Sequence, residues 1–413
     1  MFRQITLVFV FLALGRLLTT AQQEGCTDPR ALNFNPSAIV NNGSCAYPVT
    51  VANPPFRFEL PQQVKETSGL LWFNGKLWTF NDSGGNPVLY ALDTITGAVV
   101  QQITVTNVSN DDWEDITMDD QYIYIGDFGN NDGTRTNLAI YKVLKSSIPI
   151  NGNSGVQATS IKFSYEDQTE FIKSKNHNFD CEAVIATGDS LYLFTKNRAD
   201  QHCHIYSLPK SPGTFQARRK ARFNTNGLIT GADYHPVTKH IVLTGYTQKT
   251  YVPFVWLLFD FEDNNFFGGN KRRIELANLF TTQIEGVAFN GLFKVVISAE
   301  KSPTFNARVF DFEHENWTGF TSTDELKEET NQKRLSVVEN PVVHGKLKIK
   351  INLLKGDFRL DILDSTGKVV RQLNLKQDQE EVIELDVSNL AQGTYFLAAH
   401  TGRRTYSSMF IIP

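Results

Sequence analysis

The chain has 413 residues, a formal net charge of -4 and 20% charged residues. This length allows more than one domain, and the mildly acidic balance without a basic patch argues against a nucleic-acid partner. Residues 1–21 start with the basic Arg3, continue with an apolar run and end in small residues, the pattern of a secretory signal peptide. No later run is apolar for the length of a membrane helix. We therefore expect an exported chain with no transmembrane segment in its mature form.

Residues 22–52 are rich in Asn, Asp, Pro and Gly around Cys26 and Cys45. That composition forms turns and builds no core without a disulfide. The segment GCTDPRALNFNPSAIVNNGSC, from Gly25, resembles a short module of secreted Bacteroidetes proteins that is grouped with thrombospondin type 3-like calcium repeats. We expect a disulfide-bonded module followed by a linker, with a calcium site at Asp28 as the alternative.

The four cysteines are Cys26, Cys45, Cys181 and Cys203. An even number in an exported protein predicts disulfides, although the sequence does not choose among the pairings. The local pairs 26–45 and 181–203 would each close a loop of about twenty residues and stabilise the fold by roughly 3 kcal/mol. Because His202 and His204 flank Cys203, a zinc site is the alternative for the second pair.

Residues 53–322 contain an internal repeat. Five stretches open with a carboxylate or its replacement and continue with small or apolar residues: ETSGL from Glu66, EDITM from Glu114, EAVI from Glu182, TGADY from Thr230 and EGVAF from Glu285. A second hydrophobic run follows each start, and the starts recur roughly every 48 to 68 residues. Short strand patterns separated by turns give about four strands per repeat.

The repeat predicts an all-β fold with a five-bladed β-propeller. The extra strand pattern at residues 56–60 either joins the last blade and closes the ring or belongs to a sixth blade. Residues 149–177 read as a loop or hairpin inserted after the second blade.

The innermost strand of each propeller blade lines a central channel, so equivalent residues of successive blades converge on one axis. We expect this convergence for Glu66, Glu114, Glu182 and Glu285, with Thr230 in fifth place and with Asp82, Asp127 and Asp233 as further acids. Unpaired carboxylates in a narrow channel require raised pKa values or a bound cation. Their hard oxygen atoms predict calcium as the cofactor.

Two other interpretations of these acids stay open. They accept backbone N–H bonds or pair with cations, or they form a catalytic carboxylate set. The candidate cations, which are also candidate ligand-binding residues, are Arg135, Lys196, Arg198 and Lys301. Trp113 either stacks on a ring-bearing ligand or packs inside a blade.

Several segments of this region resemble bacterial propellers grouped with phytase-like and esterase-like domains: FNDSGG from Phe80, DWEDI from Asp112, GDFGNN from Gly126, DCEAV from Asp180 and IEGVAF from Ile284. The resemblance implies the fold and supplies no catalytic residue set. In plan the region is also similar to calcium-activated nucleotidases, which are five-bladed and place an axial calcium among carboxylates.

Residues 323–334 are polar and charged, as expected of a linker, and residues 335–413 alternate like the strands of a small immunoglobulin-like β-sandwich. This last segment, with DVSNLAQGTY from Asp386, resembles the type A C-terminal (Por) sorting domain of type IX secretion. The resemblance implies contact with the type IX machinery and a location outside the cell or on the outer-membrane surface.

Two functions follow from these patterns. The first is a secreted propeller that binds an extracellular ligand, glycan or protein, with calcium on its axis. The second is a calcium-dependent hydrolase of phosphate esters or other small esters. No set of nucleophile, base and orienting residue can be assembled from spacing alone, which favours the binding function.

Overall fold

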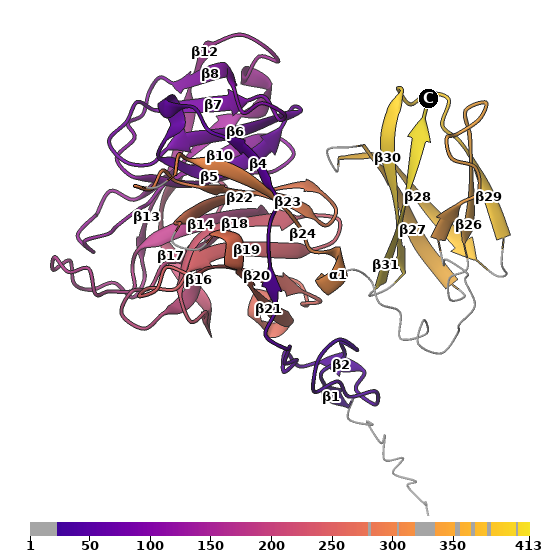
Figure 1. The fold of residues 1–413 in the computed structure, drawn as a ribbon, viewed down its shortest axis with the longest axis horizontal. Coiled ribbons are helices and arrows are strands. Elements are labelled where there is room, and N and C mark those ends of the chain that lie inside the picture. The colour runs from indigo at the N-terminus through magenta and orange to yellow at the C-terminus, as the bar shows by residue number, and fades with distance from the viewer. Residues whose placement is uncertain are drawn as a thin grey trace, which may run out of the picture.

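The computed structural model describes residues 23–279, 282–303, 305–318, 335–351, 356–364, 368–377, 381–401 and 404–413. The predicted signal peptide, residues 1–21, and the predicted linker, residues 323–334, lie outside the described residues. Strands dominate both described bodies, the propeller and the yellow β-sandwich of Figure 1, which confirms the predicted all-β class.

Five antiparallel blades surround one channel (Figure 1). Their innermost strands contact one another in sequence around the ring and are β5 (Thr67–Phe73), β9 (Trp113–Met118), β14 (Cys181–Thr187), β18 (Leu228–His235) and β22 (Ile284–Gly291). The second strands are β6 (Lys76–Asn81), β10 (Tyr122–Asp127), β15 (Ser190–Thr195), β19 (His240–Tyr246) and β23 (Lys294–Ala299). The third strands are β7 (Val88–Leu92), β11 (Ala139–Leu144), β16 (His202–Pro209), β20 (Pro253–Phe259) and β24 (Arg308–Glu313).

The fourth strands show how the ring closes. Blades one to four take theirs in chain order: β8 (Val99–Val105), β13 (Ala158–Tyr165), β17 (Gly213–Asn224) and β21 (Asn270–Leu276). Blade five takes β4 (Phe56–Glu59), which precedes blade one in the chain and pairs with β24. The first strand of the propeller thus joins its last blade, and the ring has five blades rather than six.

Residues 149–177 contribute more than the predicted loop or hairpin. They supply β13, the fourth strand of blade two, and β12 (Ser154–Val156), which pairs in parallel with the edge of blade one. Strand β13 also pairs in parallel with β17, so that blades two and three share one continuous sheet of eight strands.

Each pair of neighbouring blades encloses its own apolar cluster. Trp78 and Trp113 lie between blades one and two, and Phe194 and Phe254 lie between blades three and four. The inner strands approach so closely that a β-carbon on Gly231 would lie 2.2 Å from the Glu285 carbonyl oxygen. Small residues therefore follow the repeated starts because the next blade's backbone occupies the space of a side chain.

The N-terminal module is held against blade four. Cys26 and Cys45 form the predicted disulfide, and β1 (Glu24–Gly25) pairs with β2 (Val40–Asn41). The amide of Asn41 donates to Asn270 at 2.9 Å, and β3 (Val51–Ala52) adds a parallel strand to the edge of β21. The Asp28 carboxylate accepts hydrogen bonds from the Tyr47 hydroxyl and the Arg30 amide.

The second predicted disulfide is wrong, because Cys181 and Cys203 are free buried thiols. They lie on β14 and β16, on either side of β15, so about 9–10 Å of sheet separates them. Cys181 also faces the core between blades two and three, whereas Cys203 faces the core between blades three and four. A disulfide needs Cα atoms within about 7 Å, and the opposed directions equally prevent the two thiols from sharing a zinc ion.

The C-terminal body is a sandwich of two sheets around an apolar core that includes Leu347, Leu360 and Phe410. One sheet contains β25 (Leu335–Val337), β26 (Lys346–Ile351) and β29 (Glu381–Asp386). The other contains β27 (Gly356–Leu363), β28 (Val369–Gln377), β30 (Gly393–Thr401) and β31 (Arg404–Ile412). A four-residue helix, α1 (Glu315–Thr318), ends the described part of the propeller.

Candidate functional site

Every inner strand has a bulge at the same position, next to the end of the channel where these strands begin. In β14, for example, Cys181 pairs with Thr195 and Ala183 with Phe194, so Glu182 is the extra residue. The equivalent shift occurs in the other four hairpins. We call the five bulge residues the bulge ring: Ser68, Glu114, Glu182, Thr230 and Glu285.

The bulge ring contains the expected Glu114, Glu182, Thr230 and Glu285, but Ser68 rather than Glu66 holds the position in blade one. Glu66 lies two residues before the bulge, its side chain is 51% exposed, and its Oε1 lies 3.2 Å from Lys65 Nζ. The two hydroxyl members of the ring bind the next blade: Ser68 Oγ donates to the Glu114 carbonyl, and Thr230 Oγ1 donates to the Ile284 carbonyl at 2.6 Å.

A second set of equivalent positions lies at the end of the second strand of each blade, directly after the strand in four blades and as its last residue in blade four. It contains Asp82, Phe128, Lys196, Tyr246 and Glu300. The residue at this position repeatedly donates its backbone N–H to the segment before the bulge, as in Lys196 to Asp180 at 2.8 Å and Glu300 to Gln283 at 3.1 Å. Phe128 packs in the apolar cluster between blades two and three. The other four residues interact electrostatically with acids of the bulge ring.

Lys196 is the buried cation of this region. Its Nζ lies 3.0 Å from Glu182 Oε2 and 5.5 Å from the centre of the Tyr246 ring. Burial alone would lower the pKa of Lys196, but Glu182, Tyr246 and Glu285 more than offset this and raise it above its ordinary value. Lys196 therefore stays charged.

The remaining acids have no such partner. Among the described residues, neither the Glu114 nor the Glu285 side chain forms a hydrogen bond or ion pair, and both residues are more than nine-tenths buried. Burial, reinforced by the neighbouring acids, raises the pKa of both carboxyls well above its ordinary value. The same causes raise the pKa of Asp112 and of Glu300 to about 7 and also raise the pKa of Asp82.

Asp112 and Glu114 lie next to each other. A β-carbon built on Gly129 would lie 2.1 Å from Glu114 Oε1 and 2.4 Å from Asp112 Oδ2, so both carboxylates border the same small space. Two like charges so close, and largely out of water, favour a state in which they share one proton. Gly129 is required here because any side chain would displace both acids.

We call this group the acidic mouth: Asp82, Asp112, Glu114, Glu182, Lys196, Glu285 and Glu300. It can bind a cation or a ligand rich in hydrogen-bond donors, and a proton-sharing carboxyl pair can serve as acid and base. Five of its acids lack a cation of their own, which disfavours an anionic ligand unless a metal ion binds first.

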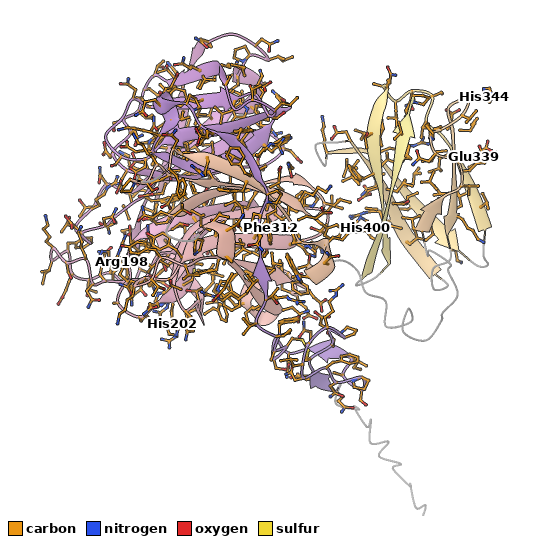
Figure 2. The ribbon with its side chains drawn as sticks, in the orientation of Figure 1. Arg198, His202, Phe312, Glu339, His344 and His400 are labelled. Atoms are coloured by element: carbon orange, nitrogen blue, oxygen red, sulfur yellow. A yellow bond between two sulfur atoms is a disulfide. The ribbon has the colours of Figure 1, made fainter. Side chains whose placement is uncertain are left out.

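The other predicted cations support the structure around the mouth. Arg135 Nη2 lies 2.8 Å from Asp127 Oδ1, and Arg198 pairs with the fully buried Asp180. Asp127 also accepts the Tyr141 hydroxyl and the Asp112 amide, so its carboxylate is already satisfied. Arg198 lies in the loop between β15 and β16, and His202 begins β16 (Figure 2). Lys301 is exposed, and its backbone N–H donates to the Lys65 carbonyl.

Two further predicted residues lie away from the mouth. Trp113 is completely buried between blades one and two against Phe80, so its indole is not available to stack on a ligand. Asp233 lies further along the channel, where Oδ2 accepts the Phe289 N–H at 2.7 Å and ties blade four to blade five. Asp115 ties blade two to blades three and four in the same way, through the N–H groups of Val184 and Ala232.

Sequence reasoning missed Ser68, Asp112, Tyr246 and Glu300. The sequence does carry a signal for Glu300 and Ser68. Asp82, Lys196 and Glu300 each come directly after the second hydrophobic run of a repeat. Aligning the repeats on that run, rather than on the first acid, would have placed Glu300 beside Lys196 and Ser68 opposite the other starts.

A second buried group of titratable residues lies at the other end of blade four. His235 ends β18, His240 begins β19, and His314 follows β24. The rings of His240 and His314 lie 5.6 Å apart, among Phe259, Phe289, Phe293 and Phe312. We call these three residues the histidine cluster.

The histidine cluster is held neutral by burial. Burial lowers the pKa of His235 to about 4 and that of His314 to about 3, and it lowers the pKa of His240 well below its ordinary value. The charged groups that act on the three rings are the rings themselves and Arg30, all of which oppose protonation. His240 Nδ1 and His314 Nε2 have no hydrogen-bond partner in the described part of the chain.

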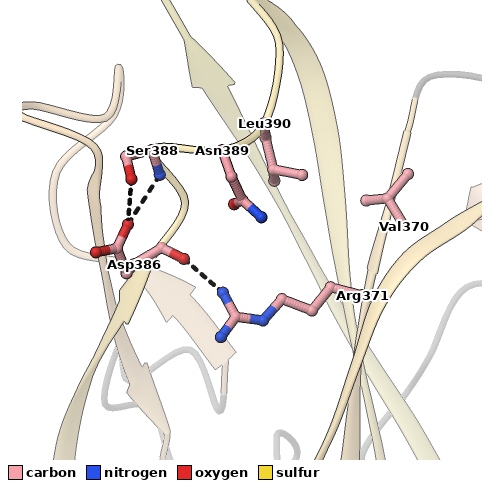
Figure 3. A pocket seen from close by; sticks show the side chains of 6 residues that line it. All are labelled: Val370, Arg371, Asp386, Ser388, Asn389 and Leu390. Atoms are coloured by element: carbon pink, nitrogen blue, oxygen red, sulfur yellow. Dashed lines mark hydrogen bonds between the residues drawn. The ribbon is translucent and has the colours of Figure 1, made fainter.

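The β-sandwich has a shallow cavity of about 530 Å³, lined by residues of the sandwich itself (Figure 3). Its lining includes Arg371, which donates to the Asp386 carbonyl, and Ser388, which donates to the Asp386 carboxylate at 2.6 Å. These contacts fix a turn of the sandwich, and they add nothing to the acidic mouth.

The family comparison identifies the C-terminal body. Residues 340–413 match the secretion system C-terminal sorting domain. This confirms the sorting-domain prediction: the protein is carried by type IX secretion to the cell surface or the extracellular space and engages that machinery. No described helix has the length and apolar character needed to cross a membrane.

Comparison with solved structures concerns the fold alone. An exo-β-1,3-galactanase from Phanerochaete chrysosporium is 8% identical with a TM-score of 0.43, and the match covers 87% of this chain and 98% of that one. A sucrose-6-phosphate hydrolase from Lactobacillus gasseri is 12% identical with a TM-score of 0.34, and 89% of each chain is covered. No curated protein matches the sequence. The resemblance to phytase-like and esterase-like propellers stays a prediction.

Proposed function

We propose that this exported propeller binds an extracellular ligand, a glycan or protein surface, at the acidic mouth, and that a calcium ion held by the bulge ring completes the site. One observation carries the proposal: all five bulge residues have a side-chain oxygen, and the carboxylates of Glu114 and Glu285 are buried without a partner. Hard oxygen donors in this number suit calcium, and a bound cation would relieve the repulsion that raises their pKa values.

The residues that would hold calcium are Glu114, Glu182 and Glu285, with Ser68 and Thr230 beside them. As the side chains stand, no three acidic, histidine or cysteine side chains in the described part of the chain form a metal-ligand group. Glu182 is instead engaged by Lys196. Calcium would supply positive charge at the mouth, and a ligand's hydroxyl or carboxylate oxygen could then approach acids that otherwise repel it.

Thermal unfolding of the exported protein in chelator, in 5 mM magnesium and in calcium tests the cation. We expect calcium to raise the Tm progressively and magnesium to raise it less, because magnesium requires a smaller and more regular oxygen shell. An unchanged Tm at millimolar calcium would contradict calcium binding. Glycan arrays and pull-down from surface material, each with calcium and with chelator, then test the ligand.

Hydrolysis is the second candidate, favoured by the adjacent carboxyls of Asp112 and Glu114. One of the pair could donate a proton to a leaving oxygen while the other, ionised, activates water. A panel of phosphate monoesters, nucleotides and small carboxylic esters, with and without calcium, tests it. Turnover that Asp112→Asn lowers at least a hundredfold at unchanged Tm would establish this function. Turnover that the variant leaves intact would remove the pair from consideration.

A further inference from the structure

At two places in the bulge ring, Ser68 and Thr230, a hydroxyl residue stands between two acids, and the Lys196 side chain lies beside the second. Blades three and five contribute Glu182 and Glu285, and blade four, between them, contributes only the short Thr230. The Thr230 hydroxyl donates its hydrogen bond to the Ile284 carbonyl. The Lys196 ammonium lies over the Tyr246 ring of blade four and interacts electrostatically with Glu285 of blade five.

Lys196 is held there by contacts that an external cation would have to replace. Its side chain is 7% exposed, and the Glu182 side chain that it contacts is 3% exposed. The Tyr246 face adds a cation–π contact. Groups that act on the ammonium from every neighbouring blade are acidic or aromatic: Asp82, Glu114, Asp180, Glu182, Tyr246, Glu285 and Glu300.

We infer that Lys196 is a built-in cation that competes with an external cation for the carboxylates of Glu182 and Glu285, and so sets the affinity of the mouth. The inference rests on the proposed cation site. A calcium ion that takes Glu182 as a ligand breaks the 3.0 Å ion pair and displaces the ammonium from the ring. Calcium then binds more weakly than it would to the five oxygen donors without a competing ammonium. Its binding also moves the Lys196 side chain.

The first experiment measures calcium affinity by calorimetry for the full exported protein and for Lys196→Met. The methionine keeps the length and apolar stem of lysine but removes the charge. We expect calcium to bind Lys196→Met at least tenfold more tightly than the wild type, because the competitor is gone and Glu182 is free. Lys196→Arg keeps the charge and should stay within about twofold of the wild type. Lys65→Met removes the exposed partner of Glu66 and is the matched control, with unchanged affinity expected.

The second experiment needs no variant and so holds even if Lys196→Met fails to fold. Lysines of the wild type are acetylated with and without calcium, and the modified positions are quantified by mass spectrometry. The Lys196 amine should be protected in chelator and become at least threefold more reactive in calcium. Lys65 should react equally in both.

The outcomes separate the inference from the proposed function. Calcium binding that is at least tenfold tighter in Lys196→Met than in the wild type supports the inference, and if the wild type shows no binding at all, the same result also overturns the proposed function. Equal affinities, or a Lys196 reactivity that calcium leaves unchanged while it binds, overturn the inference and leave the proposed calcium site standing. Absence of binding to the wild type and to a folded Lys196→Met overturns both.

Discussion

The two ends of the propeller ring hold buried ionisable groups in opposite ways. At one end, the acidic mouth crowds six carboxyls around Lys196 and leaves Glu114 and Glu285 without partners. At the other end, the histidine cluster keeps three imidazoles neutral in a cage of phenylalanines. An added cation would stabilise only the acidic mouth, whereas protonation would destabilise the histidine cluster. The difference distinguishes the cation site that we propose from a core that tolerates buried polar groups.

Removing the cation of the mouth should have the largest effect on stability. Lys196→Met leaves Glu182 buried without its partner, and breaking a buried pair in this way costs about 3–5 kcal/mol. We expect a loss of about 3 kcal/mol in the free energy of unfolding at pH 7 in chelator, measured by urea titration, with partial recovery in calcium. His314→Phe, in the histidine cluster, should change stability much less. Equal losses in the free energy of unfolding of the two variants would contradict the difference between the acidic mouth and the histidine cluster.

Acidification should act mainly through the histidine cluster. The folded pKa of His235 is about 4 against an ordinary 6.5, so the unfolded chain binds more protons between these values. The stability contributed by its neutral form is therefore complete above pH 6.5 and lost as the pH falls toward 4. This single group accounts for about 3 kcal/mol over that range. Unfolding free energies at pH 7, 6, 5 and 4 should show the decline, and His235→Phe should flatten it.

Calcium affinity should depend on the mouth alone. Glu285→Gln removes one charged donor and should weaken calcium binding about tenfold, or roughly 1.4 kcal/mol. His235→Phe, at the opposite end of the neighbouring blade four, should leave the dissociation constant unchanged. Calorimetry at pH 7 measures both variants. A comparable loss in the histidine variant would mean that the two ends are coupled.

Alkaline conditions should produce the smallest effect and act through the mouth. The folded pKa of Asp112 and of Glu300, about 7, lies above the ordinary carboxyl value. Their protonated forms favour folding below the ordinary value, and this contribution is lost as the pH rises through 7. Both carboxyls are partly exposed, and solvent screening reduces the effect. We therefore expect the free energy of unfolding in chelator to be about 1 kcal/mol lower at pH 8.5 than at pH 6. Asp112→Asn should reduce the slope, and calcium should remove it. An unchanged slope in the variant would contradict the raised pKa.

The sequence predicted the ring of blades because a propeller repeats one local pattern. Hydrophobic runs, turns and the small residues after each start recur without reference to distant contacts, and β4 was recognisable as an extra strand. Four of the five ring members, Glu114, Glu182, Thr230 and Glu285, followed from the same repeat. Glu66 was misplaced because acidity, rather than strand register, was used to align blade one, and the bulge at Ser68 appears only when β5 pairs with β6.

Pairings across the ring were decided by the tertiary structure. The separation of Cys181 from Cys203 depends on which faces of blade three they occupy, and the burial of Trp113 depends on blade one packing against it. Lys196 and Glu182 meet within the single hairpin β14–β15, whereas the contacts of Lys196 with Tyr246 and Glu285 require blades four and five. Spacing along the chain fixes the local strand pattern, since each strand depends on its own residues. Charge balance and burial depend on neighbours from other blades, and only the closed ring brings those together.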